Sequence, residues 1–162
     1  MHRLAPHQPA PVASTSDRGC RSGDSDVRLV LTAIPEQVSL ARRAVTQLAT
    51  AAGLDDDLRA GVALAVSEAC SNVVIHAYAG TEPGELHVRA EATAGRLIVA
   101  VGDRGKGMCP RSDSPGIGLG LPLMASLCST LEVRERKGGG TEICMVFTSA
   151  AVDAGAAWAR TG

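Results

Sequence analysis

The sequence predicts an α+β fold, a two-layer sandwich in which helices lie on one face of a mixed, mostly antiparallel sheet. In several short segments the hydrophobic residues alternate with a period of two, and in three others they recur with helical spacing. The resulting order is strand, helix, helix, strand, strand, loop, helix, strand, strand. Strands that follow one another between helices favour a sheet with its helices gathered on one face.

The 162 residues suffice for one domain with its own core. Residues 1–26 are rich in Pro, Ser, Asp, Arg and Gly and show no periodicity, so we expect a disordered N-terminal tail. The folded domain is expected over 27–150. The Ala-rich end, 151–162, is expected to be a short C-terminal tail.

The first half of the domain is predicted to be one strand and two helices. The segment 27–34, VRLVLTAI, alternates and is rich in β-branched residues, as strands are. A helix begins at Pro35, which suits a first helical turn, and ends at Gly53. Asp55 is the expected N-cap of a second helix that runs to about Tyr78.

The second half begins with two segments of period two, 85–92 and 96–103, which we expect to pair through a turn near Gly95. The Gly-rich stretch 102–120 is too irregular for an element. Two further elements follow it, a helix and a hairpin whose turn holds three consecutive glycines. Their expected positions are 121–129 for the helix, 131–147 for the hairpin and 138–140 for its turn.

Composition excludes several classes of function. Tyr78, Phe147 and Trp158 are the only aromatic residues, which argues against base-stacking platforms, and the formal net charge is −1. The five cysteines show no zinc spacing, and their odd number fits a reducing compartment. There is no run of the roughly 18 apolar residues that a membrane span needs, nor a secretory segment. We therefore expect a cytoplasmic protein that binds neither nucleic acid nor a membrane directly.

The segment 67–78, SEACSNVVIHAY, places three polar residues at four-residue spacing on an otherwise apolar helix: Glu68, Asn72 and His76. Residues four apart project from the same strip of a helix, and unpaired polar groups are costly to bury there. Two interpretations remain open at this point. The side chains hydrogen-bond one another or a neighbouring loop, or the strip faces a cleft in which Asn72 binds a metal and Glu68 moves a proton.

Glycines follow the strand that ends in VGDRGKGM. Asp103 at the strand end, with Gly105 and Gly107 after it, would allow a flat ligand to approach the backbone, since glycine has no Cβ. The alternative is a simple turn. A Walker A loop is excluded, because Gly-Lys is followed by Gly107 and not by Ser or Thr.

Two more glycine motifs come later in the chain. In SPGIGLGLPLM, the alternating Gly116, Gly118 and Gly120 lie directly before a helix start, where free amides and the helix dipole favour anions. The alternative is a flexible loop that ends in a helix cap. In GGGTE, Thr141 stands at a strand start. Alone, this motif indicates only a hairpin.

Together and in this order, the four motifs resemble the boxes of the GHKL (Bergerat-fold) ATPases, which include type II topoisomerases and histidine-kinase catalytic domains. SEACSNVVIHAY is similar to the N box, DRGKG to the next box, GIGLGL to the glycine box and GGGT to the last box. The resemblance covers about residues 27–148 and implies a histidine-kinase-like ATPase fold. Within the superfamily, the chain looks most like the small anti-sigma-factor serine/threonine kinases.

The resemblance implies ATP and Mg²⁺ as cofactors. It implies that Asp103 accepts a hydrogen bond from the adenine amino group with support from Thr141, that Asn72 coordinates Mg²⁺ and that Glu68 is the general base. The polar line that includes His76 would face the nucleotide. The loop glycines would wrap the nucleotide: Gly105, Gly107, Gly116, Gly118 and Gly120.

By the same resemblance, the protein would phosphorylate an anti-sigma-factor antagonist, sequester a sigma factor and form a homodimer. The alternative is a catalytically silent module in which ATP only sets the conformation that grips a partner. The segment between Gly107 and Gly116 favours this alternative, because it is short and Arg111 is its only cation. Arg111 is one candidate for contact with the γ-phosphate, and Lys106 is a second.

Overall fold

The structure, a computed structural model, describes residues 25–106, 120–150 and 152. The expected tails lie almost wholly outside the described residues, and so do Gly107, Gly116 and Gly118. The elements follow the predicted order. The strands are β1 Ser25–Thr32, β2 Glu85–Thr93, β3 Arg96–Gly102, β4 Thr130–Glu135 and β5 Thr141–Thr148. The helices are α1 Pro35–Ala51, α2 Asp56–Asn72, the π-helix η1 Val73–Ala77 and α3 Gly120–Leu127.

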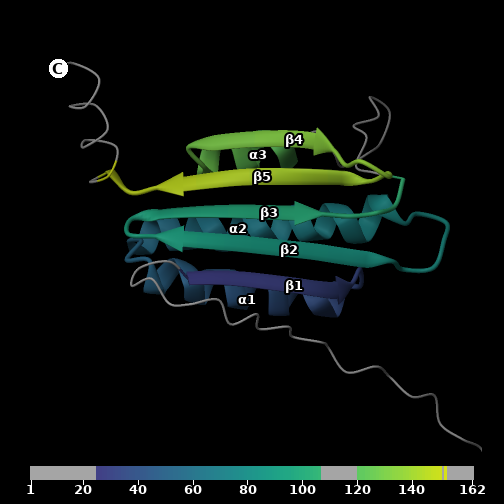
Figure 1. The fold of residues 1–162 in the computed structure, drawn as a ribbon, viewed down its shortest axis with the longest axis horizontal. Helices are drawn as coiled ribbons and strands as arrows, with labels where there is room; N and C mark the ends of the chain where they lie inside the picture. The colour runs from purple at the N-terminus through teal and green to yellow at the C-terminus, as the bar shows by residue number, and fades with distance from the viewer. Residues whose placement is uncertain (1–24, 107–119, 151, 153–162) are drawn as a thin grey trace, which may run out of the picture.

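The strands form one sheet in the order β1-β2-β3-β5-β4. Every neighbouring pair among the described strands is antiparallel, so the sheet has no parallel pair of the kind that a mixed sheet contains. Figure 1 shows the helices together on one face of this sheet. The predicted α+β fold with helices on one face is therefore confirmed. Strand β1 begins at Ser25, two residues before the expected start.

The core lies between the sheet and the helices. Alternate residues of the central strands face the helices, so the period of two in the sequence becomes one buried and one open face. The apolar stripe of α2 faces this core. Its members Val62, Ala65, Val66, Ala69 and, at the start of η1, Val73 are fully buried, and Leu58 in the first turn is partly buried against them. Phe147 of β5 is also fully buried and is among the largest side chains of the core.

Local signals set the helix ends. Pro35 is in the first turn of α1, where its missing N–H is not needed. After α1, Gly53 has φ 73°, a conformation that glycine adopts readily. The Asp55 side chain caps α2 by accepting from Leu58 N at 2.9 Å. The N-cap predicted at Asp55 is therefore confirmed.

Helix α2 is less enclosed than its apolar sequence indicates. Leu64 is 47% exposed and Ile75 in η1 is 60% exposed, although the segment is apolar on nearly every side. The 22-residue segment Asp56–Ala77 is also long and apolar enough to cross a membrane by length and composition alone. A helix packed in a globular core passes the same test, and α2 packs here against α1, α3 and the sheet.

Candidate functional site

Asp103 lies directly after strand β3 and is completely buried. Because Gly102 pairs with Glu142 at the last rung of the β3–β5 ladder, Asp103 and Thr141 meet just beyond it. The Asp103 N–H donates to Thr141 O at 2.9 Å, and the Thr141 N–H donates to Oδ2 of Asp103 at 3.1 Å. The antiparallel pair thus brings together two residues that the sequence predicted for one site.

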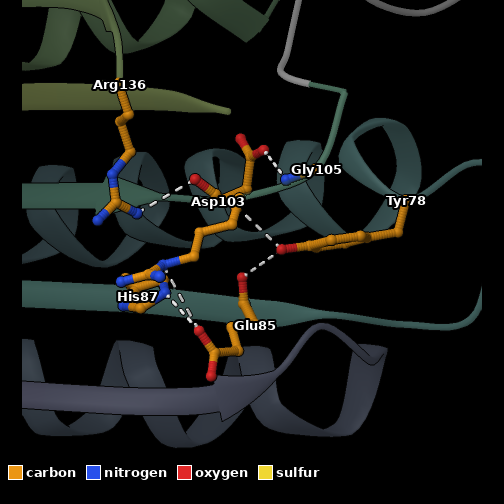
Figure 2. A network of polar contacts seen from close by, with 7 residues as sticks. Tyr78, Glu85, His87, Asp103, Gly105 and Arg136 are labelled. Carbon is orange, nitrogen blue, oxygen red and sulfur yellow. Dashed lines mark hydrogen bonds and ion pairs between the residues drawn. The ribbon is translucent and has the colours of Figure 1, made fainter. Parts of the chain in front are cut away.

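The other carboxylate oxygen of Asp103 is held within its own loop. Oδ1 accepts from Gly105 N at 2.8 Å, as Figure 2 shows. A buried carboxylate needs such partners, and here each oxygen has one backbone N–H. Because an ionised carboxylate oxygen has more than one acceptor position, each can still accept a further donor. The arrangement suits a ligand that offers an N–H group.

Two glycines near Asp103 are required by the protein's own backbone. A Cβ at Gly105 would overlap Ala77 O, and a Cβ at Gly140 would overlap Asp103 O. The turn after β4 therefore packs directly on the loop after β3. Glycine at 105 was expected to let a ligand approach, but close packing against the end of η1 already demands it.

Glu68 on α2 meets the start of α3. A Cβ at Gly120, the first residue of α3, would overlap Oε1 of Glu68. Two residues predicted for the site are thus in contact, and glycine at 120 makes room for the carboxylate. The positive end of the α3 dipole favours a negative charge at this place.

Glu68 and Asn72 are both half-buried on the same side of α2. Among the described residues, no hydrogen bond joins the two side chains, so the interpretation that they pair only with each other is not supported. Their exposed fractions leave both open to a ligand.

The line of polar side chains changes register after Asn72. Helix α2 ends there as an α-helix, and Val73–Ala77 continues as the π-helix η1. A π-helix bonds residues five apart and often occurs at functional sites. His76 is half-buried in η1. The prediction of one continuous α-helical line therefore holds for Glu68 and Asn72 but not for His76.

Within the described residues there is no group of three or more His, Cys, Asp or Glu that could hold a metal ion. A cation held near Asn72 would therefore take few ligands from the described residues. The predictions for Gly107, Gly116 and Gly118 lie outside the described residues.

Comparison with known proteins identifies the family. Residues 31–147 match the family described as the histidine kinase-like ATPase domain. The chain belongs to this family. The match spans the sheet and the helices from the end of β1 to the end of β5, which agrees with the resemblance over 27–148.

Individual relatives indicate which group of this ATPase family the chain belongs to. The serine-protein kinase RsbW of Bacillus licheniformis is 34% identical over 126 residues, 68% of this chain and 78% of that protein. RsbW of Bacillus velezensis is 30% identical over 144 residues, 80% and 90% of the two chains. The anti-sigma F factor of Clostridium beijerinckii is 32% identical over 93 residues, 51% and 65%. The protein is a member of the GHKL anti-sigma-factor kinase family, a family of serine/threonine kinases.

Sequence reasoning missed two residues of this ATPase-family site. The Arg136 Nη1 donates to Asp103 O at 3.1 Å, and the Tyr78 hydroxyl accepts from Arg104 N at 3.0 Å. Figure 2 shows both side chains pointing at the Asp103 loop from different elements. The only available signal was that Tyr78, the single tyrosine of the chain, closes the first motif.

A charged cluster borders the same loop on the open face of the sheet. His87 Nε2 lies 3.0 Å from Oε2 of Glu85, and Arg104 Nε lies 3.7 Å from the same oxygen. Burial lowers the pKa of His87 from its ordinary 6.5, the charge of Arg136 lowers it further, and Glu85 opposes both. The net effect is a lowered pKa, which favours the neutral form of His87.

Proposed function

We propose that the protein is an ATP-dependent serine/threonine kinase that phosphorylates an anti-sigma-factor antagonist, sequesters a sigma factor and acts as a cytoplasmic homodimer. Its relatives are named serine-protein kinase RsbW and anti-sigma F factor, which supports this choice of partners. The structural observation that carries the proposal is the contact of Glu68, on α2, with Gly120 at the start of α3. Asn72 lies one helical turn after Glu68 on the same helix.

The donor chemistry of the described residues fits a nucleotide and a hard cation. The buried Asp103 carboxylate retains acceptor capacity for the adenine amino group, and Thr141 N holds that carboxylate in place. Asn72 offers an amide oxygen, which is a suitable Mg²⁺ ligand. The absence of a larger ligand cluster in the described part suits Mg²⁺, which takes few protein ligands and keeps water and phosphate oxygens.

When bound, Mg-ATP supplies the phosphoryl group and the charge neutralisation that its transfer needs. The chain would then have three tasks. Asp103 would select and orient the base, and Asn72 would hold the metal. Glu68 would take the proton of the substrate hydroxyl as that oxygen attacks.

A second candidate function is the catalytically silent, ATP-dependent binding module. One observation favours it. Lys106, a candidate cation for the γ-phosphate, donates from Nζ to Ala79 O at 3.3 Å, and its backbone N–H donates to Ala77 O at 2.9 Å. Both bonds direct Lys106 to the turn after η1, so transfer would depend on a cation from elsewhere.

The Glu68→Gln variant tests the proposal. Glutamine keeps the size and most hydrogen bonding of glutamate but cannot accept the proton. ATP affinity should change little, while phosphoryl transfer falls by on the order of 10²–10⁴, the usual contribution of a positioned base. Transfer is measured with γ-labelled ATP and an anti-sigma-factor antagonist protein, beside a nucleotide titration of each variant.

The matched control is Glu36→Gln, which removes a carboxylate from the first turn of α1 and should leave transfer unchanged. Transfer by Glu68→Gln within a few-fold of the unchanged protein would remove Glu68 from the mechanism. Nucleotide binding without transfer by any of the three proteins would favour the binding module.

A further inference from the structure

Tyr78 connects three segments that are separate in the sequence. It follows η1 directly, and its hydroxyl donates to Glu85 O, at the start of β2, at 2.8 Å. The same hydroxyl accepts from Arg104 N, in the loop after β3, at 3.0 Å. Figure 2 shows the ring lying between these two backbones, with both bonds at its oxygen. One phenol oxygen therefore uses its donor and an acceptor position at once.

The ring of Tyr78 is seated between two glycines. A Cβ at Gly84 would overlap ring atoms Cε1 and Cζ, and a Cβ at Gly105 would lie 3.0 Å from Cε1. Any larger residue at Gly84 would push the ring away. The sequence thus leaves space for the ring on both sides, which argues that its placement is specific.

The bond from Arg104 belongs to a group of three that joins η1 and its turn to the loop. The other two run from Lys106 N to Ala77 O at 2.9 Å and from Lys106 Nζ to Ala79 O at 3.3 Å. The loop carries Asp103 at its head. Because Arg104 directly follows Asp103 in the chain, a displacement of Arg104 would also shift the buried carboxylate.

We propose that Tyr78 is a positioning residue for the nucleotide: its hydroxyl fixes the Asp103 loop to the end of the helix that carries Glu68 and Asn72. The proposal rests on the proposed function, in which Asp103 binds the base and Asn72 the metal. Tyr78 touches neither. It sets the spacing between the base-binding and metal-binding halves of one site, because its oxygen bonds the loop while its own backbone continues η1.

The Tyr78→Phe variant removes only the hydroxyl and keeps the ring between the glycines. Glu85 and Arg104 are exposed, so water replaces the lost partner and the fold should persist. We expect ADP affinity to fall about 3- to 10-fold, the range that one hydrogen bond supports. In phosphoryl transfer, the KM for ATP should rise by a similar factor while kcat changes little, because Glu68 does not move.

Hydrogen exchange checks the mechanism without nucleotide. The backbone amide of Arg104 should exchange faster in Tyr78→Phe than in the unchanged protein, since its acceptor is gone. The matched control is Thr81→Val. It removes another hydroxyl bond of the same turn, from Thr81 Oγ1 to Tyr78 O at 2.9 Å, and no hydrogen bond within the described residues joins its side chain to the Asp103 loop. It should leave ADP affinity and Arg104 exchange unchanged.

A second variant acts on the ring from outside the site. Gly84→Ala displaces the ring of Tyr78 without touching the Asp103 loop, so ADP affinity should fall as well. In a Tyr78→Leu background the same substitution should have a much smaller effect. If Gly84 mattered only for folding, Gly84→Ala would lower stability equally with Tyr78 and with leucine at position 78.

The outcomes separate the two proposals. If the unchanged protein does not bind ADP or ATP, the proposed function falls and the role of Tyr78 falls with it. If it binds nucleotide and Tyr78→Phe binds within twofold of it, only the role of Tyr78 is overturned. Equal losses in Tyr78→Phe and Thr81→Val would also overturn it, since the effect would then come from the turn in general.

Discussion

Cys70 shows at the scale of one residue how burial changes chemistry. The thiol lies on α2, is fully buried, and desolvation raises its pKa from 9.0 to about 12. Cys128 and Cys144 are only half-buried. Burial raises the pKa of each of these thiols too, but both are less enclosed than Cys70. Because the thiolate is the reactive form of cysteine, the three residues should differ in reactivity.

We expect Cys70 to resist alkylation in the folded protein at pH 8. A rise in pKa of three units, from 9.0 to about 12, lowers the thiolate fraction about 10³-fold, and the helix also blocks access. Mass spectrometry after treatment with N-ethylmaleimide measures the labelling of each cysteine. Cys144 is the internal control. Native labelling of Cys70 as fast as Cys144, rather than only after unfolding, would contradict the burial.

The site residues that sequence could predict are those whose partners are other motif residues. Asp103 and Thr141 were expected together through the resemblance, and the β3–β5 pair brings them together. Tyr78 could not be predicted in its role, because both partners of its hydroxyl are backbone atoms of distant segments. Backbone partners leave no mark in a side-chain pattern. The clearance between Glu68 and Gly120 is likewise visible only in three dimensions.

At the scale of an element, the turn between β4 and β5 joins stability to the site. Gly138, Gly139 and Gly140 have φ of 95°, 100° and 90°, in the region that favours glycine. Their surroundings differ. A Cβ at Gly138 would meet nothing within 4 Å, whereas a Cβ at Gly140 would overlap Asp103 O.

Gly138→Ala and Gly140→Ala should therefore separate conformational strain from packing. We expect Gly138→Ala to lower the free energy of unfolding by about 1–2 kcal/mol, the strain of a left-handed residue with a side chain. Gly140→Ala should lower it by about 1–3 kcal/mol more, because the turn must move off the Asp103 loop. Urea unfolding of both variants measures the difference. Equal losses would mean that the turn does not press on the loop.

Element boundaries were predictable where a local cap or turn residue sets them. Pro35 and Asp55 marked the two long helices correctly, and the glycines at 138–140 marked the hairpin. The π-helix η1 was not foreseen, since its five-residue bonding leaves no period that distinguishes it from an α-helix over so short a stretch. The two pairs joined by short turns, β2–β3 and β4–β5, were predicted, but the pairings β1–β2 and β3–β5 were open, because alternation describes each strand alone.

At the scale of the whole molecule, the two faces of the sheet have opposite chemistry. The helices cover the apolar face, while the open face carries charged side chains from four strands or their ends, including Arg28, Arg89, Glu142 and Arg136. These residues line a hollow of about 530 Å³. His87 lies in that hollow with 17% of its side chain exposed. The protonation of His87 therefore depends on the charged side chains that the neighbouring strands bring into this hollow.

Folding stability should decrease when the pH falls from 7.5 to 5.5, in part through His87. Its pKa is lower in the folded protein than the ordinary 6.5, chiefly through burial and then through Arg136. The unfolded chain therefore takes up the proton first, so the contribution is complete above about pH 6.5 and is lost as the pH falls below it. Thermal or urea unfolding across this range measures the slope.

The His87→Gln variant should show a shallower loss over the same pH range, since glutamine does not titrate. His76→Gln is the matched comparison, because it removes a histidine of η1 that does not line the hollow, and it tests whether losing any histidine has the same effect. A slope in His87→Gln as steep as in the unchanged protein would mean that other groups account for the pH dependence.

The order of the described strands leaves β1 and β4 at the two margins of the sheet, each with one neighbour. Margins with free backbone groups invite strands from other molecules and so begin aggregation. Both carry charged side chains in the sequence SDVRLVLT of β1 and TLEVRE of β4. A foreign strand that added there would bring its own side chains against Arg28 or Arg134. Charges at both margins therefore oppose the edge-to-edge addition of strands from other molecules.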